Sequence, residues 1–94
     1  SGRLDDARRR LRSALRRSPS DAALYKLLAR VEGERDQWAQ SFQAMAEYAF
    51  LRDELDQALG HLQAAMTHSA DSAYLKASID ARIKEIERNR GKTK

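Results

Sequence analysis

The scarcity of chain-breaking residues most constrains the fold of this sequence. Its 94 residues include one proline and four glycines. Strand turns and irregular loops depend on these two residue types, whereas the interiors of helices exclude them. Alanine, leucine, arginine, glutamate and glutamine, which favour helices, are abundant instead. The sequence therefore predicts an all-α domain whose helices are joined by short connections.

Apolar residues recur at helical spacing in five segments, separated by polar residues that can cap a helix. In the first segment, Leu4, Leu11 and Leu15 share one face and arginines occupy the others. Pro19 ends this segment because proline cannot continue the helical hydrogen-bond ladder. We expect Gly33 to end the second helix in a left-handed conformation. The predicted helices cover residues 4–17, 22–33, 37–52, 55–68 and 73–89.

Short connections make consecutive helices antiparallel neighbours, and we expect a single domain over residues 1–90. The third helix carries apolar residues on more than one side, so it should be the most buried and contact two others. Residues 91–94 are expected to form a disordered tail. Helical periodicity begins within the first few residues, and we expect the chain to be a piece of a longer array of helices.

Two of the predicted helices share one pattern of small and large apolar residues. The matching positions are Ala7, Leu11 and Ala14 in the first helix and Ala58, Leu62 and Ala65 in the fourth. This pattern resembles the second helix of a tetratricopeptide repeat, in which small residues let paired helices approach each other. Pro19 matches the terminal proline of that repeat, and Tyr25 and Leu28 match the aromatic and leucine positions of the helix that follows. The resemblance implies antiparallel helical hairpins stacked as a short right-handed solenoid of about five helices.

Three residues depart from the tetratricopeptide pattern. Glu32 replaces a tyrosine, Ser41 replaces a packing alanine, and Asp53 replaces the glycine between helices. The offset between the two matching helices is also not a multiple of the repeat length of about 34 residues. We therefore expect an overlapping arrangement in which the third helix completes one hairpin and opens the next.

A longer series of short motifs spans residues 24–86. It comprises Leu27-Leu28-Ala29, Arg35-Asp36-Gln37, Ala46-Glu47-Tyr48-Ala49-Phe50-Leu51, Leu55-Asp56-Gln57-Ala58 and Ile79-Asp80-Ala81-Arg82-Ile83. In order and spacing, the series resembles the carboxyl-terminal repeat region of periplasmic zinc metallopeptidases of the β-barrel assembly-enhancing protease type. In that family, a peptidase domain with a His-Glu-x-x-His zinc motif precedes the repeats, and the repeats hold substrate and the outer-membrane protein assembly machinery. The resemblance implies a periplasmic binding module without catalytic residues or cofactor, beside a peptidase domain that alone carries zinc.

Residues that could support catalysis or bind a metal are few. The sequence has no cysteine, and its two histidines, His61 and His68, lie two turns apart on one predicted helix. That separation, about 10 Å along the helix, is too large for a shared metal ion. No stretch approaches the roughly 20 consecutive apolar residues of a membrane span. We therefore expect no catalytic, cofactor or metal site and no membrane insertion, and the periplasmic location rests on the resemblance alone.

The net charge of +4 is unevenly distributed. Residues 1–30 hold nine Lys or Arg and three acids, for a net charge of +6. Residues 31–70 hold two Lys or Arg and seven acids, for a net charge of −5. Residues 71–94 hold seven Lys or Arg and four acids, for a net charge of +3. Nucleic-acid binding calls for exposed aromatic residues among the basic ones, whereas the aromatic residues here fall on or beside packing faces. Protein surfaces, not nucleic acid, are therefore the expected partners, with the arginine-rich first helix facing an acidic domain.

The concave surface of stacked helical hairpins is the usual place for a bound peptide. Lys26 and Arg30 lie one turn apart at positions that point into this groove in tetratricopeptide domains, and Gln43, Glu47 and Phe50 are expected beside them. We predict that these five residues bind an extended peptide, with the two cations pairing with a carboxylate or acidic side chain. An ordinary solvated helix face is the alternative interpretation.

The first helix has apolar residues that would lack cover if its hairpin partner is absent. We expect either weak self-association through residues 4–17 or docking of this helix on the rest of the domain. The favoured function is a non-catalytic protein-interaction module belonging to a periplasmic metallopeptidase. A free-standing helical-repeat adaptor is the first alternative, and a basic nucleic-acid-binding helical domain is the second.

Overall fold

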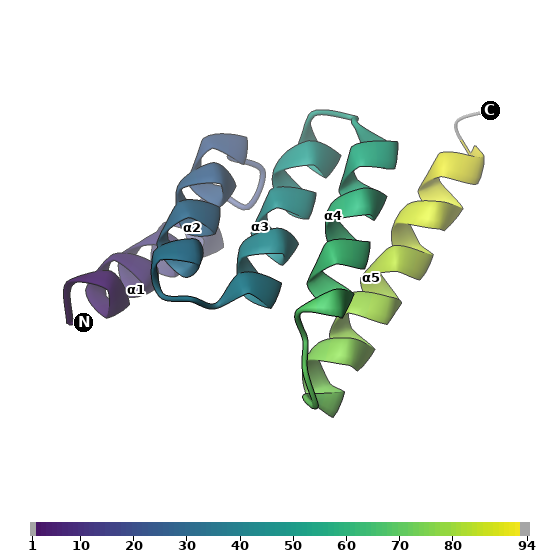
Figure 1. Cartoon of the computed structure of the whole chain (residues 1–94). Coiled ribbons are helices and arrows are strands. Elements are labelled where there is room, and N and C mark those ends of the chain that lie inside the picture. Colours follow the sequence, from purple (N-terminus) through teal and green to yellow (C-terminus); the bar gives the residue numbers. More distant parts are fainter. Residues whose placement is uncertain (1, 93–94) are drawn as a thin grey trace.

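The computed structural model describes residues 2–92, which form five α-helices and contain no strand. Consecutive helices run in opposite directions and stack side by side (Figure 1). The predicted all-α fold of packed antiparallel helices is confirmed. The helices are α1 (Gly2–Arg17), α2 (Ala22–Glu34), α3 (Trp38–Leu51), α4 (Leu55–Thr67) and α5 (Ala73–Lys92).

Helix α3 lies between α2 and α4 and packs against both (Figure 1). Its buried alanines pack in two separate clusters, one on each side of the helix. Ala44 packs in a cluster with Leu15 of α1 and Leu28 of α2, whereas Ala46 and Ala49 pack in a second cluster with residues of α4 and α5. Small side chains on both sides let neighbouring helices approach closely. The expectation of a two-sided third helix is therefore met.

The positions matched to the repeat pattern are buried to different degrees. On α4, Ala58, Leu62 and Ala65 are all buried in the second cluster. On α1, the corresponding residues Ala7 and Ala14 are only half-buried. Within residues 2–92, α2 is the single helix whose backbone lies close to that of α1, so α1 is covered on one side. The remaining positions are Leu11, which is half-buried, Pro19, which is exposed in the turn before α2, and Tyr25 and Leu28, which pack in the first cluster.

The connections after α2, α3 and α4 each contain one residue with a left-handed backbone. These residues are Asp36 (φ 60°), Asp53 (φ 63°) and Ala70 (φ 50°), and no glycine among residues 2–92 has positive φ. The expectation that Gly33 ends α2 in this conformation is therefore wrong. Asp36 takes that role because a short polar side chain tolerates the left-handed region. Asp53 likewise adopts the conformation that the repeat pattern assigns to glycine.

Helix α5 continues to Lys92, beyond the expected end at residue 89 and into the expected tail. No proline interrupts it, and Gly91 alone weakens a helix by only about 1 kcal/mol. Arg90 donates a 2.6 Å hydrogen bond to Asp56 of α4, which ties the last turns to the neighbouring helix. Residues 93–94 of the expected tail lie outside the described residues. Throughout residues 2–92, no helix has the long apolar run that crossing a bilayer requires.

Candidate interaction surfaces

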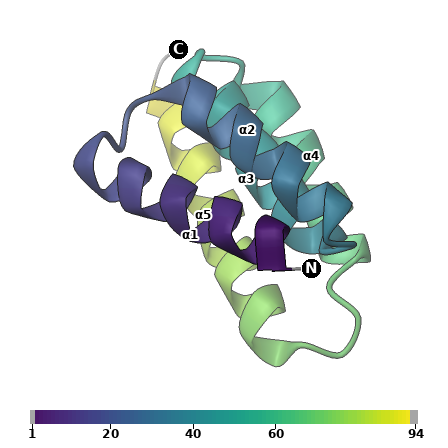
Figure 2. The same ribbon diagram turned by 90° about the vertical axis from the view of Figure 1, so that its left-hand side faces the viewer.

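A groove of about 480 Å³ crosses α3 between α1 and α5. Seen along the stack, α1 and α5 lie on the same side of α2, α3 and α4 (Figure 2). Arg12 of α1 and Arg82 of α5 line the two sides of the groove, and Gln43 and Glu47 of α3 line its centre. This groove therefore contains two of the five predicted binding residues, Gln43 and Glu47.

Neutral polar side chains face this groove without an internal hydrogen bond. They are Gln40 and Gln43 of α3, Tyr25 of α2 and Ser78 of α5. Within residues 2–92, no side-chain hydrogen bond engages any of the four. Burial, together with the negative charge of Glu47, raises the pKa of Tyr25, so its hydroxyl keeps its proton. Carboxamides and hydroxyls offer both donors and acceptors, as a peptide backbone does.

An ion pair between α3 and α5 forms part of the groove wall. Arg82 donates two hydrogen bonds to Glu47, from Nε to Oε2 and from Nη2 to Oε1, both 2.8 Å long. These bonds raise the pKa of the Arg82 guanidinium. The guanidinium also lies over the ring of Phe50, 4.6 Å from the centroid. Glu47 and Phe50 of the predicted site therefore make internal contacts with Arg82, a residue that the sequence analysis did not place in the site.

The other two predicted residues, Lys26 and Arg30, line a separate hollow of about 480 Å³ between α2 and α3. Trp38, which is 48% exposed, and Met45 supply much of its apolar lining. The two hollows have no lining residue in common, because the helical period turns Gln43 and Glu47 away from the face of α3 that carries Met45. The structure thus does not bring the five predicted residues into one site.

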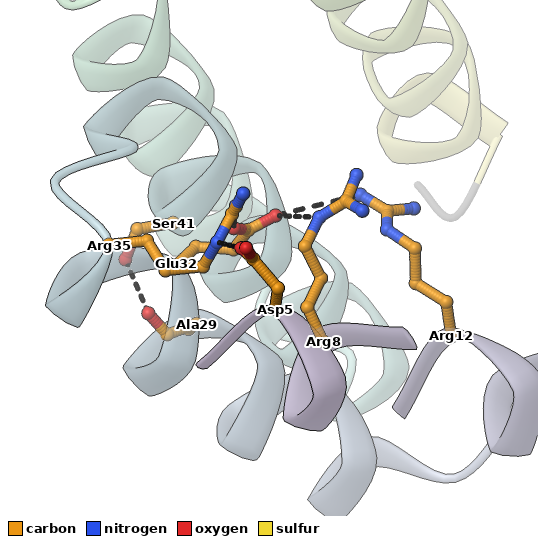
Figure 3. Close-up of polar contacts among 7 residues, drawn as sticks. All are labelled: Asp5, Arg8, Arg12, Ala29, Glu32, Arg35 and Ser41. Carbon is orange, nitrogen blue, oxygen red and sulfur yellow. Dashed lines mark hydrogen bonds and ion pairs between the residues drawn. The ribbon is translucent and has the colours of Figure 1, made fainter. Parts of the chain in front are cut away.

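A fully buried carboxylate lies among arginines where α1 meets α2 (Figure 3). Glu32 accepts hydrogen bonds from Nε of Arg8 (3.2 Å) and Nη1 of Arg35 (2.6 Å), and Nη2 of Arg12 lies 3.7 Å away. Arg35 also donates a 2.9 Å hydrogen bond to Asp5 of α1. The hydrogen bond to Glu32, and then that to Asp5, raises the pKa of Arg35. Since Arg12 also lines the groove, this ion cluster helps to position one of its sides.

Ser41, the second departure from the repeat pattern, also forms a polar contact between helices. Its hydroxyl donates a 2.7 Å hydrogen bond to the backbone carbonyl of Ala29, which joins α3 to α2 (Figure 3). The carbonyl oxygen has two lone pairs, and the helical hydrogen bond uses one of them. The second lone pair accepts the serine hydroxyl, so the hydroxyl has a hydrogen-bond partner within the interface. Glu32 and Ser41 therefore replace apolar packing by specific polar contacts.

The two histidines lie against an aromatic ring. The rings of His61 and His68 stack on Phe42, with centroid distances of 6.3 and 5.4 Å. Among residues 2–92, no group of three or more His, Asp or Glu side chains is placed to hold a metal ion.

Comparison with known proteins found no match to the chain among family models, curated proteins or solved structures. The resemblance to the repeat region of periplasmic metallopeptidases thus rests on the sequence motifs.

Proposed function

We propose that this chain is a non-catalytic protein-interaction module that binds an extended segment of another protein in the groove over α3. The observation that carries the proposal is the set of unpaired neutral polar side chains, Tyr25, Gln40, Gln43 and Ser78, which line the groove together. A peptide backbone that leaves water needs a partner for each N–H and C=O group. Side chains that offer donors and acceptors, and have no partner of their own, can meet that need.

The fixed charges of the groove support a partner without a strong net charge. Arg12 and Arg82 are cationic, whereas Glu47 and Glu85 are anionic, and the Arg82–Glu47 pair is already formed. Because both signs occur around the groove, neither a strongly acidic nor a strongly basic segment has an electrostatic advantage. Affinity would come from hydrogen bonds to the backbone and from side-chain packing against the exposed Ala81 of the groove wall.

Within this proposal, the resemblance assigns the module to the repeat region of a periplasmic zinc metallopeptidase that takes part in outer-membrane protein quality control. The exposed arginines of α1 would then face the peptidase domain of the same chain. A free-standing adaptor is the alternative. A His-Glu-x-x-His peptidase domain upstream in the gene would support the first assignment, and its absence there would support the second.

The groove can be tested with short peptides selected from a random library on the intact chain and measured by calorimetry. The double variant Gln40→Ala/Gln43→Ala is expected to weaken binding about tenfold or more, because each lost hydrogen bond contributes about 0.5–1.5 kcal/mol. The matched control is Gln57→Ala/Gln63→Ala, which removes two exposed glutamines of α4 outside the groove. The control should bind like the wild type.

Equal affinities of the wild type and the groove variant, with the variant folded by circular dichroism, would contradict the proposal. A selection that returns no peptide able to bind the wild type would contradict it as well.

A further inference from the structure

We infer that the hollow between α2 and α3, here called the tryptophan hollow, is a second docking site that receives an acidic protein segment bearing a large apolar side chain. Its apolar lining comes from Ala29, Trp38 and Met45, and Lys26 and Arg30 provide cations on α2. The inference goes beyond the proposed function, because this hollow and the groove have no lining residue in common.

Trp38 is exposed but held in place, which suits it to anchor a partner. Its ring lies over Gly33, where a Cβ would make an ordinary van der Waals contact of 3.4 Å with Cζ3 of the indole. The last turns of α2 therefore form a seat against which the ring packs. A tryptophan that is already ordered loses little side-chain entropy on binding, and such residues contribute strongly to protein interfaces.

The interior of the hollow favours an apolar side chain. The hollow is shallow and open to solvent, and most of its accessible lining is apolar. Ser41 contributes a hydroxyl to the lining, but that hydroxyl already donates to the carbonyl of Ala29. Leu27, which is 46% exposed and lies about one turn before Arg30, is a further exposed apolar side chain of α2. An aliphatic or aromatic side chain is therefore the occupant that fits.

The charges on α2 favour an acid next to that apolar side chain. Among residues 2–92, no acid pairs with either Lys26 or Arg30. Lys26 instead lies over the ring of Tyr48, 5.6 Å from its centroid. The acid of the hollow, Glu34, lies one turn beyond Arg30 on α2. A bound carboxylate would thus be drawn toward Lys26 and Arg30 and away from Glu34, which gives the segment a preferred direction.

The sequence contains a single tryptophan, so the emission of Trp38 reports occupancy directly. The probe is the blocked peptide Glu-Asp-Phe-Leu-Asp-Glu, titrated at low salt into the intact chain. We expect emission to shift to shorter wavelength as the indole leaves water. Two companion peptides, one with lysine in place of every acid and one with serine in place of Phe-Leu, are expected to bind about tenfold or more weakly.

Variants of the chain test whether the acidic peptide binds in the tryptophan hollow. Lys26→Ala/Arg30→Ala is expected to weaken the acidic peptide about tenfold or more. The matched control, Lys76→Ala/Arg88→Ala, removes the same charge from exposed positions of α5 and should leave the titration unchanged. The groove variant Gln40→Ala/Gln43→Ala should also leave it unchanged.

Three results would overturn the inference. Equal weakening by the α5 control would show general charge attraction. A loss in the groove variant would place the peptide in the groove. A single-stranded oligonucleotide that produces the same spectral shift and displaces the acidic peptide would assign the hollow to nucleic acid.

Discussion

Glu32 brings a negative charge into a position that is otherwise suited to an apolar side chain. Its side chain is 1% exposed, whereas Arg8, Arg12 and Arg35 each keep a path to solvent. A buried charge is tolerated only when its hydrogen-bonding capacity is filled, and here Arg8 of α1 and Arg35, directly after α2, each supply a donor. This carboxylate thus helps to place α1, together with the Arg35–Asp5 hydrogen bond and the packing of Leu15.

Glu32→Gln is expected to lower the free energy of unfolding by about 2–3 kcal/mol, because it weakens two charge-assisted hydrogen bonds and leaves Arg8 and Arg12 without their counter-charge. Urea denaturation followed by circular dichroism measures the change. Glu34→Gln, two residues further along α2 and exposed, is the matched control and should stay within about 0.5 kcal/mol of the wild type. Similar losses in both variants would show that the buried cluster has no special role.

The unusual character of Glu32 and Ser41 was visible in the sequence, because both residues interrupt a recognisable pattern. Their partners were not visible. The angle at which α1 crosses α2 decides which arginine of α1 reaches Glu32. That angle cannot be predicted from the spacing of residues along the chain. The carbonyl acceptor of Ser41 is likewise a property of two packed helices.

At the scale of elements, the connections between helices depend on left-handed residues other than glycine. Asp36 and Asp53 tolerate this conformation, but Ala70 has no polar side chain to compensate for the steric cost of about 1–2 kcal/mol. The connection between α4 and α5 is therefore the most strained of the three.

Ala70→Gly is expected to raise the free energy of unfolding by about 0.5–1 kcal/mol, since relief of the left-handed backbone outweighs the added flexibility of the unfolded chain. Thermal unfolding monitored by circular dichroism measures it. Ala77→Gly, in the exposed face of α5, should instead lower stability by about 0.5–1 kcal/mol. A loss of stability in both variants would contradict the assignment of strain to Ala70.

Helices were predictable from the sequence because their apolar periodicity is local, and the two-sided pattern of α3 correctly indicated two neighbours. The candidate site was harder to predict from the sequence. Lys26 and Gln43 were expected together, but each faces the side of its helix that packing selects, so the two lie in different hollows. Trp38, at the start of a predicted helix, was the available signal for the second hollow.

At the scale of the whole molecule, the chain forms a flat body with principal extents of 45 × 31 × 17 Å. Each helix packs against its neighbours in sequence, and α3 and α5 also touch. Every helix but α1 packs against at least two others. Among residues 2–92, the backbone of α1 lies close to that of α2 and of no other helix. The apolar stripe of α1 contributes Leu11 and Leu15 to the first core cluster, and the choice between self-association and docking within the chain stays a prediction.

Amide hydrogen exchange should therefore show α1 opening before α3, because fewer contacts hold it. Mass spectrometry of the exchanging chain measures the order, and equal protection of the two helices would contradict it. The same measurement at low and high protein concentration tests the proposed self-association through residues 4–17. Protection of α1 that rises with concentration would support a weak dimer, and unchanged protection would show that docking within the chain is sufficient.

The serial packing of the helices also bears on how the chain acquires its structure. Because each helix meets the one made just before it, only short loops must close before favourable contacts form, and such topologies fold quickly. A chain of this kind can consolidate in the order of its synthesis, with α3 joining a cluster that α1 and α2 have begun and offering its second face to α4 as that helix emerges.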